Sequence, residues 1–248
     1  MYIRIAALCV LALASSLNQA AENRWQDVQQ HIQSALIEGD AAALAELREA
    51  LSTWTNDQPG WTHYWQAYLS FRLINLERDE DAREAHMLAC KASAETAIES
   101  GEQSGESHAL LASCLGRLAA GGMMAGMRYG TDSSNMLDES IFIAPDNPRV
   151  LMLAAVSDYN KPVIWGGDID RAERRLREAV EGIEMNPIND AEPWRPAWGQ
   201  VDVYGHLAIV LDRLEQGEAA LAVLDQAAER GLQSGWLDGI RARIEVEN

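Results

Sequence analysis

The sequence predicts an all-α protein, an α-solenoid of about five helical hairpins followed by one C-terminal helix. Composition is the first reason. Of the 248 residues 48% are hydrophobic but only 6% are aromatic, and the abundant alanine, leucine and glutamate favour helices. Spacing is the second reason, because apolar residues recur in steps of three and four and do not alternate as in strands. Regularly placed glycine and proline, which interrupt helices, are the third.

The breaks divide the chain into paired helices, and the residues at the breaks suit helix ends. Asn147 followed by Pro148 is typical of a helix start, and Asp79 and Asp168 precede helical stretches that they can cap. Counting between the breaks places the pairs at about 23–38 and 41–55, 61–77 and 80–100, 106–120 and 123–143, 148–162 and 169–185, and 199–215 and 218–230, with a last helix at about 234–245.

The second helices of the last two pairs share a pattern of small and large residues. Ala172, Leu176 and Ala179 are repeated as Ala220, Leu224 and Ala227, and alanine lets paired helices approach closely. This spacing resembles the second helix of tetratricopeptide (TPR) repeats, so we expect TPR-like hairpins over residues 22–247. The period exceeds the family's usual length of about 34 residues, and insertions such as "KPVIWGGDI" and "NPINDAEPWRPAWGQ" separate the helices.

Four short segments also resemble a subgroup of exported bacterial TPR-like proteins, which implies no defined chemistry. They are Gly126-Met127, Asn147–Val150, Gly166–Asp168 and Pro196–Tyr204.

The first twenty residues differ from the rest of the chain. Arg4 precedes an apolar stretch from Ile5 to Ala14, and small residues follow up to Ala20. This layout predicts a secretory signal peptide, residues 1–20, and an exported, periplasmic protein. An uncleaved membrane anchor is the alternative. Otherwise we expect no integral membrane segment.

Export would place Cys90 and Cys114 in an oxidising compartment, where one disulfide could form between them. Both cysteines lie within helical patterns rather than in loops. We therefore favour two separate buried thiols, which pack as small apolar side chains.

The charge and the missing motifs exclude several functions. A net charge of −18 disfavours binding to nucleic-acid phosphates. The sequence has no HExxH, GxxxxGK[ST] or GxSxG motif, so we predict neither catalysis nor a cofactor. His86 and Cys90 are four residues apart, but a metal site needs three or four ligands.

The segment "GGMMAGMRYG", residues 121–130, has three interpretations. A phosphate cradle is set aside because no strand precedes it. A Cu(I) site using the thioethers of Met123 and Met127 is a weaker alternative. We favour a helix on which Gly122, Gly126 and Gly130 form a flat stripe that lets another helix pack closely.

The tryptophans of the two inserted loops are the leading candidates for a binding surface. Trp165, Trp194 and Trp198 could meet at one edge of the solenoid as an aromatic wall, although sealing the loops onto the core is the commoner use of such side chains. Tyr204, Arg128 and Tyr129 are further candidates for contact with a partner.

These observations predict a non-catalytic exported scaffold or adaptor that binds a protein or peptide in its groove. The alternative is a small-molecule-binding or metal-binding accessory protein of an envelope transport system.

Overall fold

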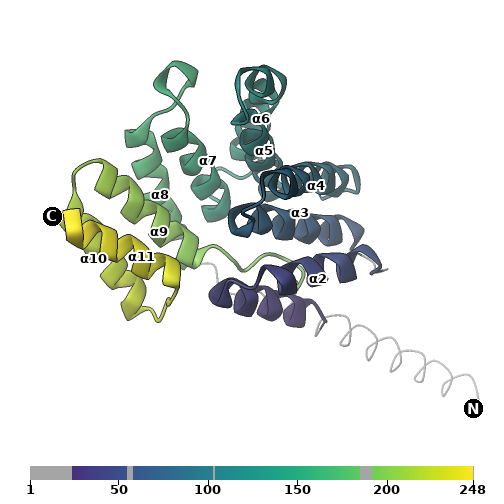
Figure 1. The fold of residues 1–248 in the computed structure, drawn as a ribbon, viewed down its shortest axis with the longest axis horizontal. Helices are drawn as coiled ribbons and strands as arrows, with labels where there is room; N and C mark the ends of the chain where they lie inside the picture. The colour runs from purple at the N-terminus through teal and green to yellow at the C-terminus, as the bar shows by residue number, and fades with distance from the viewer. Residues whose placement is uncertain (1–23, 55–57, 103, 185–191, 248) are drawn as a thin grey trace, which may run out of the picture.

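The computed structural model describes residues 24–54, 58–102, 104–184 and 192–247, and it confirms the predicted all-α fold (Figure 1). A helix over residues 24–38 precedes α2 (Ala41–Ser52). The following elements are α3 (Pro59–Leu76), α4 (Glu80–Glu99), α5 (Gly105–Ala119), α6 (Met123–Ile143), α7 (Pro148–Asn160), the short 3-10 helix η1 (Val163–Trp165), α8 (Ile169–Glu184), α9 (Gln200–Arg213), α10 (Gly217–Glu229) and α11 (Gly235–Glu247). The predicted signal peptide lies outside the described residues.

Successive hairpins are arranged in an arc, as Figure 1 shows. The first helices of the hairpins, α3, α5, α7 and α9, pack against one another in sequence, and α4, α6, α8 and α10 each pack on a partner from this inner row. The turns between the two helices of one hairpin, such as α5–α6 and α7–α8, lie on one edge of the arc, which we call the turn edge. The connections from one hairpin to the next, such as α4–α5 and α6–α7, lie on the opposite edge, which we call the cap edge.

Small and large side chains alternate in the core, which explains how the hairpins stack. Ala172, Ala179, Ala220 and Ala227 are fully buried and let the paired helices approach. α3 is buried on almost every side because neighbours cover it on both faces of the arc. Successive aromatic rings along this helix pack edge to face, with centroids 5.4–5.6 Å apart: Trp61, Tyr64, Trp65 and Tyr68.

Polar side chains begin the helices where the sequence predicts. The Asn147 Oδ1 atom accepts hydrogen bonds from the backbone amides of Arg149 and Val150, and Asp79 Oδ1 accepts one from Ala82. None of the described helices is both long and apolar enough to span a bilayer.

The two cysteines form a disulfide between α4 and α5, with their Cα atoms 5.8 Å apart. The preference for two separate thiols is therefore wrong. Both side chains are fully buried, so the bridge lies inside the contact between two neighbouring hairpins. Periodicity places a cysteine on the buried face of a helix, but it does not show which residue of the next hairpin lies opposite.

The glycine stripe of residues 121–130 is also wrong. Gly122 precedes α6 with a φ of +123°, and a Cβ added at Gly122 or Gly130 would meet no atom within 4 Å. Only Gly126 has a neighbour, the Ala119 carbonyl oxygen at 3.5 Å. Close approach occurs instead at Gly105, where an added Cβ would lie 2.6 Å from the Cβ of Ala144.

Candidate functional site

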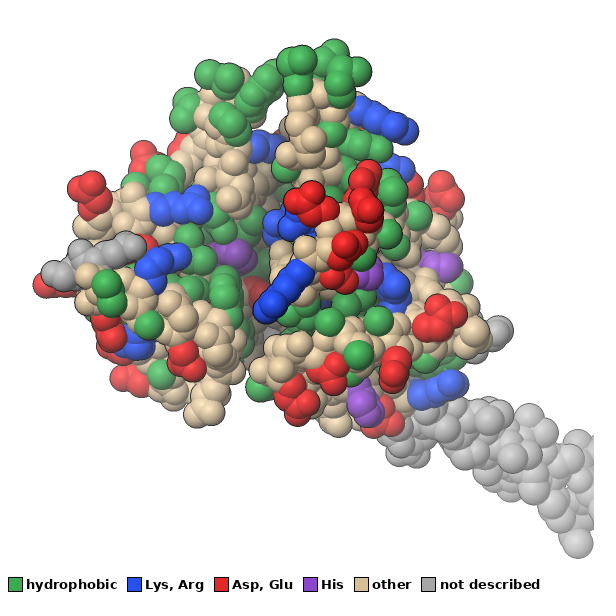
Figure 2. All heavy atoms as spheres, viewed as in Figure 1, with side chains coloured by type: hydrophobic (Ala, Val, Ile, Leu, Met, Phe, Trp, Pro, Cys, Tyr) green, Lys and Arg blue, Asp and Glu red, His purple; other side chains and the backbone are tan. Residues whose placement is uncertain are grey.

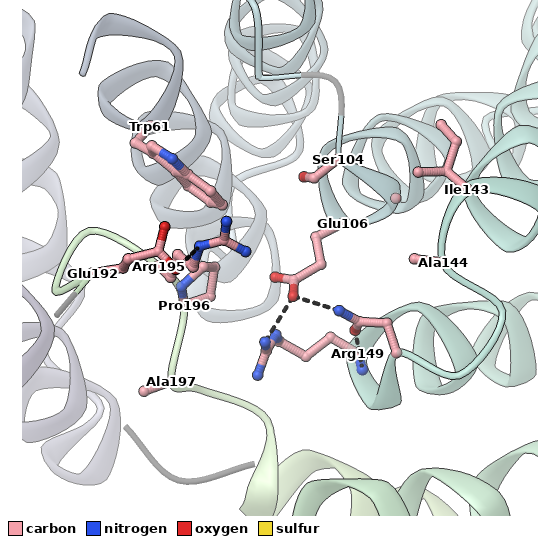
Figure 3. Close-up of a pocket in the computed structure, with 12 residues that line it drawn as sticks. Trp61, Ser104, Glu106, Ile143, Ala144, Arg149, Glu192, Arg195, Pro196 and Ala197 are labelled. Atoms are coloured by element: carbon pink, nitrogen blue, oxygen red, sulfur yellow. Dashed lines mark hydrogen bonds and ion pairs between the residues drawn. The ribbon is translucent and has the colours of Figure 1, made fainter. Parts of the chain in front are cut away.

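A pocket of about 340 Å³ opens at the cap edge, where α5 and α7 begin and the segment 192–199 passes (Figure 3). Glu106 and Arg149 point toward each other at its floor, and Trp61 and Arg195 lie on the opposite side. The N-terminal ends of α5 and α7 carry partial positive charge. The pocket could bind a charged ligand only if its own charged side chains were not already paired with each other.

The floor of the pocket is a buried polar network that connects three inner helices. Glu106 accepts hydrogen bonds from Arg149 and Asn147, both at 2.7 Å, and from the Tyr64 hydroxyl at 3.3 Å. The Tyr64 hydroxyl accepts one from Trp198 Nε1 at 2.9 Å, and burial raises the pKa of Tyr64. Among the described residues, the buried Arg149 Nε atom and the hydroxyl of the neighbouring Tyr68 have no hydrogen-bond partner. The network thus serves mainly to hold the fold together.

The inserted tryptophans do not form an aromatic wall, and Trp194 and Trp198 instead hold their loop against the core, the use that the sequence favoured. Trp198 stacks on Tyr68 with ring centroids 4.5 Å apart, and the Trp194 carbonyl accepts a hydrogen bond from Trp65, so both belong to the inner face of α3. Trp165 lies on η1, in the α7–α8 connection at the top of Figure 1, whereas Trp194 and Trp198 precede α9. The three tryptophans cannot form one surface because the two insertions lie at opposite edges of the arc. The α7–α8 connection is at the turn edge, and the segment before α9 is at the cap edge.

The segment 192–199 runs from the start of α9 toward α2 and α3 (Figure 1). Gln29 binds it from the first helix, donating to the carbonyls of Pro193 and Arg195 and accepting from the amide of Ala197. Together with Trp198 on α3, these contacts fix the segment in place. The segment therefore covers part of the inner face of α3.

The remaining predicted candidates are dispersed. Tyr204 is only 1% exposed and belongs to the core of α9, so it is not available to a partner in the groove. Arg128 is exposed on α6, with its guanidinium 5.0 Å from the ring of the half-buried Tyr129.

Two apolar tips project from the turn edge. One comprises Met123, Met124 and Met127 in the first turns of α6, and the other comprises Val163, Ile164 and Trp165 of η1. All six side chains are 73–85% exposed. Figure 2 shows hydrophobic side chains gathered at the ends of the two projecting parts at the top of the molecule. Six large apolar side chains in such positions are unusual for a surface that only meets water.

The η1 tip is held firmly in its exposed position. The Gly167 amide donates to the Pro162 carbonyl at 3.1 Å, and an added Cβ at Gly167 would lie within the contact distance of the Lys161 backbone. Arg171 donates to the Gly166 carbonyl at 2.7 Å. Lys161 spans the gap between the tips by donating to Ser134 of α6 at 3.3 Å.

Below the tips, the inner helices bring together the turn-edge cluster: Arg117, Tyr159, His206 and Arg213. The Tyr159 hydroxyl oxygen lies 2.7 Å from Nδ1 of His206, and the Arg213 guanidinium lies 4.7 Å from the centre of the Tyr159 ring. Burial lowers the pKa of His206 to about 4, and nearby guanidinium groups lower it further. His206 is therefore neutral at pH 7.

The structure places no ready metal centre in the part of the chain that it describes, where no three His, Cys, Asp or Glu side chains come together. Cys90 is in the disulfide, and Nδ1 of His86 lies 3.2 Å from Nη1 of Arg48, so these two side chains, which by sequence alone are too few for a metal site, have other partners. Met123 and Met127 remain exposed thioethers.

Sequence reasoning missed Met124, Val163, Ile164 and the whole turn-edge cluster. Val163 and Ile164 had a signal, since "VIW" followed by Gly166-Gly167 places large apolar residues directly before a tight turn. The cluster had none, because its members come from three helices that are distant in the sequence.

Comparison with known proteins gives one informative likeness. No protein family and no curated protein matches the chain. Among solved structures, its fold is similar to that of the HusA haemophore from Porphyromonas gingivalis, with a TM-score of 0.59 and 18% sequence identity over 79% of this chain and 93% of that one. At this identity the likeness concerns the fold alone. It supports a helical-repeat architecture without assigning the chain to the TPR family.

Proposed function

We propose that this chain is a non-catalytic, exported binding protein that holds a flat, apolar small molecule of the porphyrin class between its two apolar tips. The observation that carries the proposal is the exposure of six large apolar side chains on two projections that share one edge. Enclosing them against a ligand would remove apolar surface from water, which stabilises a complex by about 25 cal/mol per Å².

The chemistry of the tips suits such a ligand. Methionine is flexible and polarisable, so Met123, Met124 and Met127 can adapt to a flat face. Trp165 offers a rigid aromatic surface on the other tip. A thioether is also an axial ligand of haem iron in some proteins. Met123 and Met127, which the sequence offered as weak candidates for Cu(I), could therefore bind the iron of a haem instead.

Two further observations favour a small molecule over a peptide. The segment 192–199 is held against the first helix and α3 and covers part of the inner face, and the fold is similar to that of a protein described as a haemophore. The disulfide supports an oxidising compartment and hence export to the periplasm. A role beside an envelope transport system is consistent with this location.

The test is a titration of the purified chain with ferric protoporphyrin, followed by its absorbance and by tryptophan fluorescence. We expect saturable binding, and we expect the triple substitution of Val163, Ile164 and Trp165 by serine to weaken it at least about tenfold.

The matched control replaces exposed apolar residues away from the turn edge, Leu88 in the middle of α4 and Phe142 in the last turn of α6, by serine, and it should bind like the wild type. Equal affinity of the tip variant and the wild type would contradict the proposal. Recovery of a stoichiometric partner protein through the intact tips, without porphyrin binding, would favour the scaffold alternative.

A further inference from the structure

At the turn edge, two arginines have no carboxylate partner among the described residues. In the part of the chain that the structure describes, Arg117 and Arg213 form no ion pair, whereas Arg72 nearby is paired with Asp202 at 2.6 Å. Arg117 donates to Asn75 Oδ1 and Arg213 to the Tyr159 carbonyl, each at 3.1 Å. A guanidinium has five N–H donors, so most donors of both residues remain for another acceptor.

Both guanidinium groups act on the same tyrosine. Burial raises the pKa of Tyr159, while Arg213 and Arg117 each lower it. Arg213 also stacks on the ring. The three residues come from the last turns of α9, α5 and α7, so the parallel inner helices bring two cations and a hydroxyl to one place.

Both arginine side chains are exposed cations in a chain of net charge −18. An anion that contacts both guanidinium groups would form charge-assisted hydrogen bonds with them. Burial lowers the pKa of Arg117, whereas the nearby Tyr159 raises it. Favourable contact with the negative ends of helices is the purely structural explanation, and the experiment below distinguishes it from ligand binding.

We infer that Arg117 and Arg213, with Tyr159 between them, form a carboxylate-binding site that receives the acidic side chains of the ligand held by the tips. This inference rests on the proposed function. Arg117 precedes the turn into α6, and Tyr159 precedes η1, so both tips project beyond the cluster. A porphyrin has a flat apolar body and two propionates, which match the tips and the cluster respectively.

The test compares iron-free protoporphyrin, which has two carboxylates, with its dimethyl ester, by fluorescence titration of the full chain. The wild type is expected to bind the diacid at least about tenfold more tightly than the ester, because charge-assisted hydrogen bonds are strong. The double variant R117Q/R213Q should bind both compounds with the affinity that the wild type has for the ester.

The control removes two arginines elsewhere, Arg177→Gln and Arg241→Gln, whose partners are Glu173 and Asp225. It should keep the preference for the diacid. Equal binding of diacid and ester by the wild type would overturn the inference and leave the proposed function in place. Loss of the preference to the same extent in the control would also overturn it. Retention of the preference in R117Q/R213Q would overturn it as well, because the arginines would then only stabilise the helix ends, even if the variant has lower thermal stability. If neither compound binds, the proposed function and the inference both fail.

Discussion

Replacing Glu106 by alanine is expected to lower the free energy of unfolding by about 3–5 kcal/mol. Glu106 and Arg149 form a 2.7 Å ion pair whose side chains are 8% and 7% exposed. Removing the carboxylate leaves the Arg149 charge buried without a partner and removes the acceptor of Asn147 and Tyr64. Because the network connects α3, α5 and α7, its loss should weaken the packing of three hairpins together. Urea denaturation followed by circular dichroism measures the change.

A matched control uses an exposed ion pair. Asp225→Ala removes the partner of Arg241 at the surface and should cost no more than about 1 kcal/mol. The double variant E106L/R149M should recover a large part of the loss, because it removes both buried charges. A Glu106→Ala variant as stable as Asp225→Ala would show that the network is not a structural junction.

Removing the disulfide is expected to have an effect of similar size. The bridge closes a loop with a sequence separation of 24 residues, and a constraint of this length on the unfolded chain is worth about 3 kcal/mol. The double variant C90A/C114A should be less stable than the wild type by about this amount, with a further small loss for the cavity left at the buried contact.

Dithiothreitol supplies the control for this variant. It should lower the midpoint of thermal unfolding of the wild type and leave that of C90A/C114A unchanged. An unchanged wild-type midpoint under reducing conditions in which free-thiol titration confirms that the disulfide has been opened would contradict the assigned role of the bridge.

The fold could be predicted from the sequence because its determinants are local. Steps of three and four residues and single capping residues such as Asn147 define each helix, and α6 begins and ends at Met123 and Ile143 as expected. Glycine spacing was misleading in residues 121–130, because a stripe of glycines allows close packing but does not supply the second helix. Gly122 and Gly130 face open space.

The site could not be predicted in the same way, because it depends on which helix ends converge. The Arg117, Tyr159 and Arg213 cluster requires that α5, α7 and α9 run parallel, and no pattern within one helix shows this. Trp198 and Trp165 looked equivalent in the sequence, yet Trp198 is hydrogen-bonded inside the arc while Trp165 is 73% exposed at its edge. Only the path of each insertion distinguishes them.

The central claim is that the ligand lies between the apolar tips, and hydrogen exchange with and without ferric protoporphyrin tests it most directly. The account predicts that the porphyrin slows amide exchange in the first turns of α6 and in residues 161–168 and leaves the segment 192–199 unchanged. Slower exchange confined to the segment 192–199 and the cap-edge pocket, with the tips unaffected, would contradict it.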